Sequence, residues 1–268
     1  MTSKLKLQPK LYNLSRAKQD LLEQVFSQPP SKPILEVYRE RPEPSILRDR
    51  VMNDCSIKNV LLNHPPVIME AVLRSIQRSW DTYTESSITP HEFMRAPYGA
   101  SYEVVAIEGK GRGMVASRDI KAGQIILEES PVLLLPPGTI DIILLLTLPR
   151  KALEAILLLH NAKPNNNRFT LLKDIPVHRL LDLMSGILDT NSFDGTASCG
   201  STGVLLLRGS LFNHSDTPNM FHDWNGDDEI YVFTAQRDIK KDEELVFNYV
   251  SPNLDPAAKA ERLKNYRL

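Results

Sequence analysis

Apolar residues recur at helical spacing in two stretches of the first hundred residues. The two stripes are formed by Leu14, Ala17, Leu21, Leu22, Val25 and Phe26, and by Ile68, Val72, Leu73, Ile76 and Trp80. Spacing of three and four residues predicts an amphipathic helix over each stripe. Ten of the nineteen prolines lie within residues 1–98, so we expect a partly helical, proline-rich extension there rather than one long helix.

From Tyr102 onward, short β-type runs replace the helical stripes. The runs are EVVAI, MVASRDI, IILEE, VLLLRG, EIYVFTAQRDI and ELVFNY, and glycine-bearing turns such as GKGRG and KAGQ join the first three. Apolar runs bounded by turn residues predict strands. The small-residue stretch GTASCGSTG is expected to be a loop, and no internal repeat is evident.

The leucine-rich region between about 138 and 192 returns to helical spacing. The residues expected to start and face its first helix are Thr147, Pro149, Leu153, Ile156, Leu157 and His160. A second helix is expected over roughly 177–188, and the tail AAKAERLKNYRL is also expected to be helical.

The order of these elements predicts the fold class and the domains. Strands interrupted by a helical insert, without regular strand–helix alternation, indicate an α+β fold rather than a doubly wound one. We therefore predict an N-terminal extension over 1–98 and one domain over 99–268, with the insert at about 138–192.

The charge balance and the cysteine content limit the classes of function. The 268 residues include 32 basic and 33 acidic side chains, so no overall electrostatic attraction to nucleic acid or to an anionic membrane is expected. Cys55 and Cys199 lie far apart and form no CxxC pair, which excludes a disulfide framework and a zinc site built from cysteines. We predict no metal site.

The apolar stretches are too short to cross a bilayer. The start, MTSKLKLQPK, lacks the apolar run of a signal peptide. The most apolar stretch, Ile140 to Leu148, is interrupted by Asp141 and followed by Pro149. We therefore expect no membrane contact and a location in the nucleus, the cytoplasm or both.

Four segments resemble the motifs of SET-domain methyltransferases. GKGRGMVASRDIKAGQIILEESP, TNSF, FNHSDTPN and AQRDIKKDEELVFNY occur in the order, and at about the separations, of those motifs. The resemblance is greatest to the SET and MYND domain family, because a helical insert ending in TNSF precedes the NHS motif. It implies several short sheets with a knot-like threading of the C-terminal segment. It also implies S-adenosylmethionine as cofactor and a lysine of another protein, histone or non-histone, as substrate.

The resemblance assigns a cofactor-binding role to residues of all four segments. They are Lys110, Gly111, Arg112, Asn191, Asn213, His214 and Tyr249. Glycine at 111 permits close backbone approach to a ligand. Without the resemblance, GRG is an ordinary hairpin turn, Asn191 and Asn213 are a helix-terminal and a loop-capping asparagine, and His214 is a hydrogen-bonded core histidine.

The resemblance also assigns the catalytic residue and the lysine channel. Tyr249 is the expected catalytic tyrosine, although a tyrosine at a strand end is otherwise an ordinary core-edge residue. Phe247, two residues earlier, is expected on the same face of the strand, where it limits the number of methyl groups added. Tyr266 is expected beside the same channel.

The chain departs from the family pattern at three points. Asp216 follows NHS where the family has cysteine, no MYND zinc module is present, and the zinc-binding CxC of the family does not follow Tyr266. The missing cysteines indicate either natural loss or truncation. A SET domain that binds a peptide or partner without methylating it is therefore the alternative. A helical interaction protein acting through 1–98 would leave the C-terminal motifs unexplained.

Overall fold

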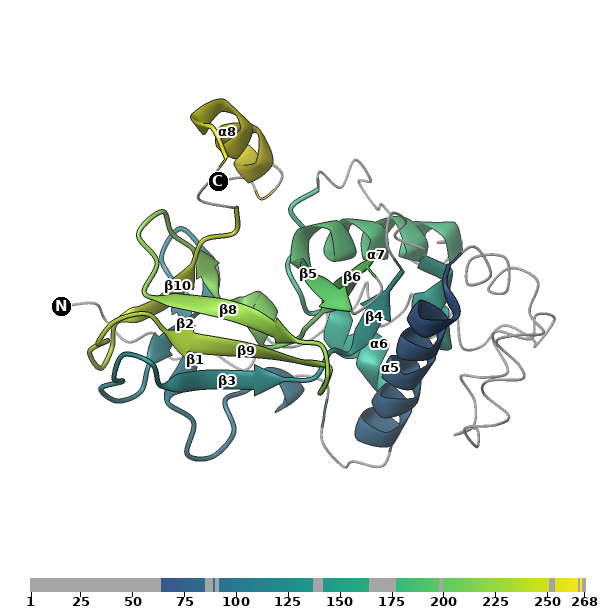
Figure 1. Ribbon diagram of the computed structural model, residues 1–268, viewed down its shortest axis with the longest axis horizontal. Coiled ribbons are helices and arrows are strands. Elements are labelled where there is room, and N and C mark those ends of the chain that lie inside the picture. Colours follow the sequence, from purple (N-terminus) through teal and green to yellow (C-terminus); the bar gives the residue numbers. More distant parts are fainter. Residues whose placement is uncertain are drawn as a thin grey trace, which may run out of the picture. The chain divides into compact units, whose positions relative to one another are not determined.

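A computed structural model of the chain describes residues 64–84, 89, 92–136, 142–163, 177–197, 200–250, 254–264 and 266 (Figure 1). The described residues belong to two compact units. The first contains those within 92–130 and 206–266, and the second contains those within 64–89 and 131–205. The helix expected over residues 14–26 lies outside the described residues, and the predicted division at residue 98 stays a prediction.

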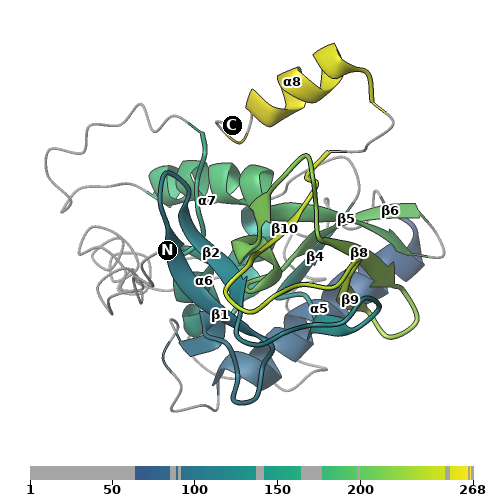
Figure 2. The same ribbon diagram turned by 90° about the vertical axis from the view of Figure 1, so that its left-hand side faces the viewer.

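The first unit is built mainly from two small sheets (Figures 1 and 2). Their strands are β1 (Tyr102–Ile107), β2 (Gly111–Ala116), β3 (Ile125–Glu129), β7 (Asn213–His214), β8 (Met220–Asn225), β9 (Ile230–Ala235) and β10 (Glu244–Phe247). One sheet has the order β1-β2-β10-β7 and the other has the order β3-β9-β8. The unit also contains the short 3-10 helices η2 (Glu92–Met94) and η5 (Gly209–Leu211) and the helix α8 (Pro256–Lys264).

The second unit combines helices with one antiparallel sheet of order β4-β6-β5. Its elements are α5 (Pro66–Thr84), β4 (Leu133–Leu135), the 3-10 helix η3 (Ile142–Thr147), α6 (Arg150–Ile156), α7 (Val177–Asn191), β5 (Ser192–Ala197) and β6 (Gly200–Leu205). The predicted helix over Ile68 to Trp80 is confirmed as α5, and its apolar stripe is buried. Trp80 donates its indole N–H to the Thr147 carbonyl at 2.8 Å, so the N-terminal helix shares a core with the predicted insert.

Two details of the second unit differ from the sequence predictions. Helix α6 ends at Ile156, so His160 lies beyond it, and the Thr147 hydroxyl donates to the Leu144 carbonyl instead of capping the helix. The stretch GTASCGSTG contributes to the hairpin of β5 and β6 rather than to a long loop. A Cβ atom at Gly195 would lie 2.6 Å from Val204 Cγ2 of the paired strand, so close packing selects glycine there despite its low strand propensity.

A short repeat, Arg-Asp-Ile-Lys, joins two turns of the first unit. Ile120 and Ile239, the third residues of the two copies, exchange backbone hydrogen bonds of 2.9 Å and are 1% exposed. Asp119 accepts from the Lys240 ammonium and the Lys241 N–H. The equivalent Asp238 accepts from the Lys121 ammonium of the first copy and from the N–H of Ala122, the residue that follows this copy. The sequence reading overlooked this repeat, which fixes the turn before β10 against the turn after β2.

A buried carboxylate anchors the segment that precedes β7. Glu129, at the end of β3, is 9% exposed, and its oxygens accept the backbone N–H groups of Leu207, Arg208 and Gly209 at 2.7 to 3.1 Å. Burial raises the pKa of Glu129, while the backbone donors oppose that rise. The interaction fixes the start of η5, four residues before Asn213.

Replacing this carboxylate should destabilise the first unit. Glu129→Ala leaves three backbone N–H groups without their acceptor, so we expect the free energy of unfolding to fall by about 1–3 kcal/mol in urea titrations. Its exposed neighbour Glu128 provides a matched control, because Glu128→Ala should change stability by less than about 0.5 kcal/mol. Equal effects of the two substitutions would contradict the anchoring role of Glu129.

Candidate functional site

The NHS and FNY segments lie side by side because β7 and β10 pair in parallel. Asn213 is opposite Val246 and His214 is opposite Phe247 in this register. The backbone N–H of Tyr249 donates to His214 Nδ1 at 3.1 Å, and the two rings have centroids 5.3 Å apart. The pairing therefore brings together four of the residues nominated from the sequence, Asn213, His214, Phe247 and Tyr249, although more than thirty residues separate the two segments.

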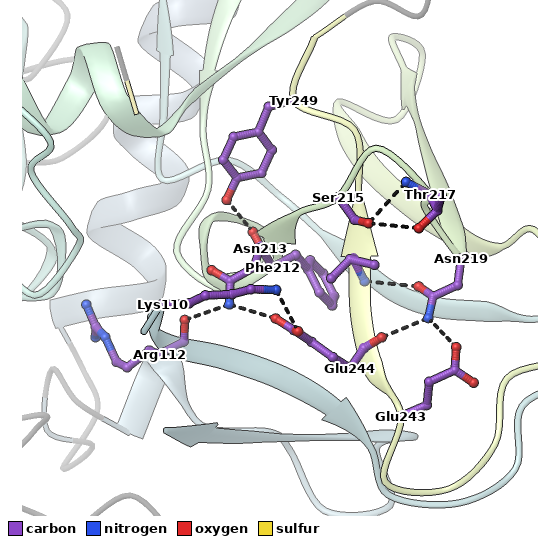
Figure 3. A network of polar contacts seen from close by, with 11 residues as sticks. Lys110, Arg112, Phe212, Asn213, Ser215, Thr217, Asn219, Glu243, Glu244 and Tyr249 are labelled. Carbon is purple, nitrogen blue, oxygen red and sulfur yellow. Dashed lines mark hydrogen bonds and ion pairs between the residues drawn. The ribbon is translucent and has the colours of Figure 1, made fainter. Parts of the chain in front are cut away.

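The Asn213 side chain reaches the backbone of β2 (Figure 3). Its Nδ2 donates to the Arg112 carbonyl at 3.2 Å and to Glu244 Oε1 at 2.9 Å. A Cβ atom on Gly113 would lie 2.5 Å from this nitrogen, so only glycine leaves room for the contact. The tripeptide GRG belongs to β2 and not to the turn, which is formed by residues 108–110.

Two adjacent carboxylates of the EEL segment hold different parts of the site (Figure 3). Glu244 accepts from Lys110 Nζ at 2.8 Å as well as from Asn213. Glu243 accepts from Asn219 Nδ2 at 3.0 Å and from the Arg237 guanidinium at 2.6 Å. Sequence reasoning missed both carboxylates. The available signal was the acidic pair at the start of the predicted strand, because consecutive side chains of a strand point to opposite faces.

Tyr249 is half-buried, and its hydroxyl proton is used in a hydrogen bond. The hydroxyl donates to the Phe212 carbonyl at 2.6 Å. Burial, followed by the neighbouring Tyr266 and Glu244, raises the pKa of Tyr249 above its usual value. The phenol therefore remains protonated at neutral pH, which excludes tyrosinate as a general base. The oxygen lone pairs remain as acceptors.

Aromatic rings surround Tyr249 on two sides. Phe247 is 5% exposed, and its ring centroid lies 4.9 Å from that of Tyr249. Tyr266 follows α8, and its ring centroid also lies 4.9 Å from that of Tyr249. His222 of β8 meets Phe247 edge-on at 4.9 Å, and no motif in the sequence singled it out. These rings give the Tyr249 site an apolar lining.

Asn191 belongs to the second unit, whereas the other nominated residues belong to the first. It is the last residue of α7, and its Nδ2 donates to the carbonyls of His160 and Ile187 at 2.7 Å. These contacts fit a helix-terminal asparagine. Its assignment to a cofactor stays a prediction.

His214 is neutral in this environment. Burial lowers its pKa, Asp216 opposes that effect, and the Lys110 charge adds to it. Its Nδ1 accepts the Tyr249 N–H, so the neutral ring carries its proton on Nε2, which lies 3.6 Å from Asp216 Oδ1. Asp216, which departs from the family pattern, thus faces the His214 imidazole, and the pairing of β7 with β10 is formed in its presence.

Comparisons with known proteins identify the family. A family model described as the SET domain matches residues 111–250, more than half of the chain, and the chain belongs to the SET-domain family. Histone-lysine N-methyltransferase set5 of Schizosaccharomyces pombe is 29% identical over 150 residues, which are 56% of this chain. The match covers 42% of that relative's own length.

A solved structure is also similar to part of the chain. It is that of a candidate histone methyltransferase of Plasmodium falciparum, with a TM-score of 0.31 and 16% identity over 57% of this chain and 96% of that one. The predicted SET domain, with several small sheets and a few helices, is confirmed by the family match. Within the described residues, no helix has the length and apolar character needed to cross a membrane.

The close approach of Asn213 to β2 can be tested at Gly113. Gly113→Ala should push the Asn213 amide off Arg112 and lower the free energy of unfolding by about 1–3 kcal/mol. The Asn213 side-chain amide resonances should move in a ¹⁵N NMR spectrum. Gly111→Ala is the matched control, because its Cβ would meet nothing within 4 Å although its φ of 78° makes alanine strained. Amide resonances that move equally in both variants would contradict the proposed contact.

The lowered pKa of His214 should make stability depend on pH. An unfolded histidine titrates near 6.5, so on acidification the unfolded state binds the proton first. The stabilising contribution is complete above that pH and is lost as the pH falls toward the folded pKa. The urea midpoint should fall more for the wild type than for His214→Gln between about pH 7.5 and 5.5. Glutamine still offers an acceptor to the Tyr249 N–H, and parallel curves would refute the assigned environment.

Proposed function

We propose that the chain is a SET-type protein-lysine N-methyltransferase that binds S-adenosylmethionine and methylates a lysine of another protein. The observation that carries this proposal is the parallel pairing of β7 with β10, which places Asn213 opposite Val246 and His214 in contact with Tyr249. The family match and the name of the fission-yeast relative support the same class of reaction. The substrate is a histone or a non-histone protein.

Residues at one end of β2, β7 and β10 suit the amino-acid part of the cofactor. Lys110 provides a cation, Gly111 and Arg112 provide backbone at the start of β2, and Asn213 and His214 provide polar groups beside it. Asn213 Oδ1 accepts no hydrogen bond from the residues that the structure describes, so it can accept one from an ammonium or amino group. In the proposal Asn191 also contacts the cofactor.

Bound S-adenosylmethionine supplies the electrophilic methyl group, and the residues around Tyr249 must orient a neutral lysine amine. Deprotonating a free lysine near pH 7.4 costs about 4 kcal/mol. An apolar lining reduces this cost because burial disfavours the ammonium form. The Tyr249 oxygen, with its own proton donated to Phe212, offers lone pairs for weak C–H···O contacts and for the amine. Orientation therefore contributes more than base catalysis.

Phe247 and Tyr266 complete the lysine channel in this proposal. Both rings contact Tyr249. Phenylalanine at 247 adds no hydroxyl that would hold the amine or a water, which favours the addition of more than one methyl group. We also propose the closer affiliation with the SET and MYND family, the knot-like threading and a location in the nucleus, the cytoplasm or both.

Methyl transfer can be tested directly with tritiated S-adenosylmethionine on a protein array that includes histones. Label on specific proteins, mapped to lysine by mass spectrometry, would support the enzyme. Cofactor binding by calorimetry without label on any protein would instead support a SET domain that acts as a peptide-binding or partner-binding module. A chain that binds no cofactor would contradict both.

Removing only the Tyr249 oxygen should separate chemistry from packing. Tyr249→Phe keeps the ring contacts, so we expect kcat to fall by about 100-fold or more while the Kd for S-adenosylmethionine changes little. Tyr102→Phe is the control, because it also removes a hydroxyl from a buried tyrosine of the first unit. Wild-type turnover by Tyr249→Phe would show that Tyr249 is not catalytic.

A further inference from the structure

We infer that Glu244 is the positioning residue that sets how Lys110 and Asn213 face the cofactor's amino-acid end. This inference rests on the proposed function, and it concerns a carboxylate to which the sequence motifs gave no role. One oxygen of Glu244 holds the Lys110 ammonium at 2.8 Å and the other holds the Asn213 amide at 2.9 Å. A single side chain thus joins the turn before β2 to strand β7 (Figure 3).

The contacts of Asn213 fix which end of its amide faces a ligand. Nδ2 lies between two groups that can only accept, the Arg112 carbonyl and the Glu244 carboxylate. Both amide hydrogens are therefore used, and the amide cannot turn over without placing its oxygen against two other oxygens. As a result, Oδ1 is the atom left for a ligand, and it is a hydrogen-bond acceptor.

The same carboxylate fixes the second group of the pair. Lys110 is 40% exposed and Glu244 is 24% exposed at the side chain, so the ammonium is held at the surface of the site with donors left over. Glu244 thereby sets an acceptor on Asn213 beside a cation on Lys110. An α-amino acid carries an ammonium donor beside a carboxylate, and this is the pattern that such a pair complements.

Only an ionised carboxylate can do this, because both of its partners are donors. A glutamine at 244 has one acceptor oxygen and one donor NH₂ group. Whichever way the glutamine amide turns, its NH₂ group faces either the Lys110 ammonium or the Asn213 amide. Glu244→Gln should therefore release one of the two groups while changing the volume of the side chain very little.

Glu243 is the matched control on the same strand edge. Like Glu244, it accepts from several donors, which here are Asn219 Nδ2, the Arg237 guanidinium and the Lys240 N–H. It contacts neither Lys110 nor Asn213. Its side chain is 30% exposed in its ion pair, close to the value for Glu244. Because Glu243 holds Asn219, which supports β10, Glu243→Gln should affect the two ends of the cofactor site alike and should not act selectively on its amino-acid end.

The test compares two ligands by calorimetry. S-adenosylhomocysteine keeps the amino-acid end of the cofactor, whereas 5′-methylthioadenosine lacks it. For Glu244→Gln we expect S-adenosylhomocysteine to bind about 10- to 100-fold more weakly, with 5′-methylthioadenosine within about two-fold of the wild type. For Glu243→Gln we expect the ratio of the two affinities to stay within about two-fold of the wild-type ratio, because any loss affects both ligands alike.

Lys110→Met provides a second route that does not depend on how Glu244→Gln folds. This exposed substitution should also weaken S-adenosylhomocysteine and spare 5′-methylthioadenosine. The double variant should bind S-adenosylhomocysteine at most about two-fold more weakly than the weaker of the two single variants. Once the Lys110 ammonium is removed, the oxygen of a glutamine at 244 is free to accept from the Asn213 amide. A purely structural role for Glu244 would weaken both ligands together and would give additive losses.

The outcomes separate this inference from the proposed function. If the wild type binds S-adenosylhomocysteine and Glu244→Gln binds it equally well, or loses both ligands alike, the positioning role of Glu244 is wrong and the methyltransferase proposal stands. If the wild type binds neither ligand, the proposed function fails and the inference fails with it.

Discussion

The parallel pairing of two short strands, β7 and β10, is the interaction on which the candidate site depends. Asn219 holds this pairing from the side: its Nδ2 donates to the Glu244 carbonyl at 2.8 Å and its Oδ1 accepts the Val246 N–H at 3.0 Å. A side-chain amide thus supplies both a donor and an acceptor to the edge of β10, as a neighbouring strand would. Without the contacts between Asn219 and β10, little would fix the register in which the two-residue strand β7 pairs with β10.

Acceptor-only side chains organise the surroundings of that pairing. Glu129 holds the backbone before η5, Glu243 holds Asn219, and Glu244 holds Asn213. In each case a carboxylate faces several donors, which a neutral amide of the same size cannot satisfy equally. The negative charges therefore act in two ways, because they fix local structure and they determine which atoms of their partners are left for a ligand.

Local patterns in the sequence were sufficient to predict helix α5, whose apolar stripe is buried, and most strands of the first unit. The four ordered motifs also predicted the SET domain. Strand β7 was missed because two residues carry no periodic signal and depend on a partner more than thirty residues away. The sequence DEEL alone does not distinguish the role of Glu243 from that of Glu244, because the two differ only in the direction in which each side chain leaves the strand.

Hydrogen–deuterium exchange with and without S-adenosylhomocysteine tests the central claim most directly, because it needs neither a substrate nor a substitution. If the β7–β10 pairing forms the cofactor site, the ligand should slow exchange in peptides covering 110–116, 211–219 and 244–250 together. Slower exchange marks the segments whose backbone hydrogen bonds open less often when the ligand is bound. Slowed exchange confined to segments outside these three, in the presence of saturating ligand, would contradict the account.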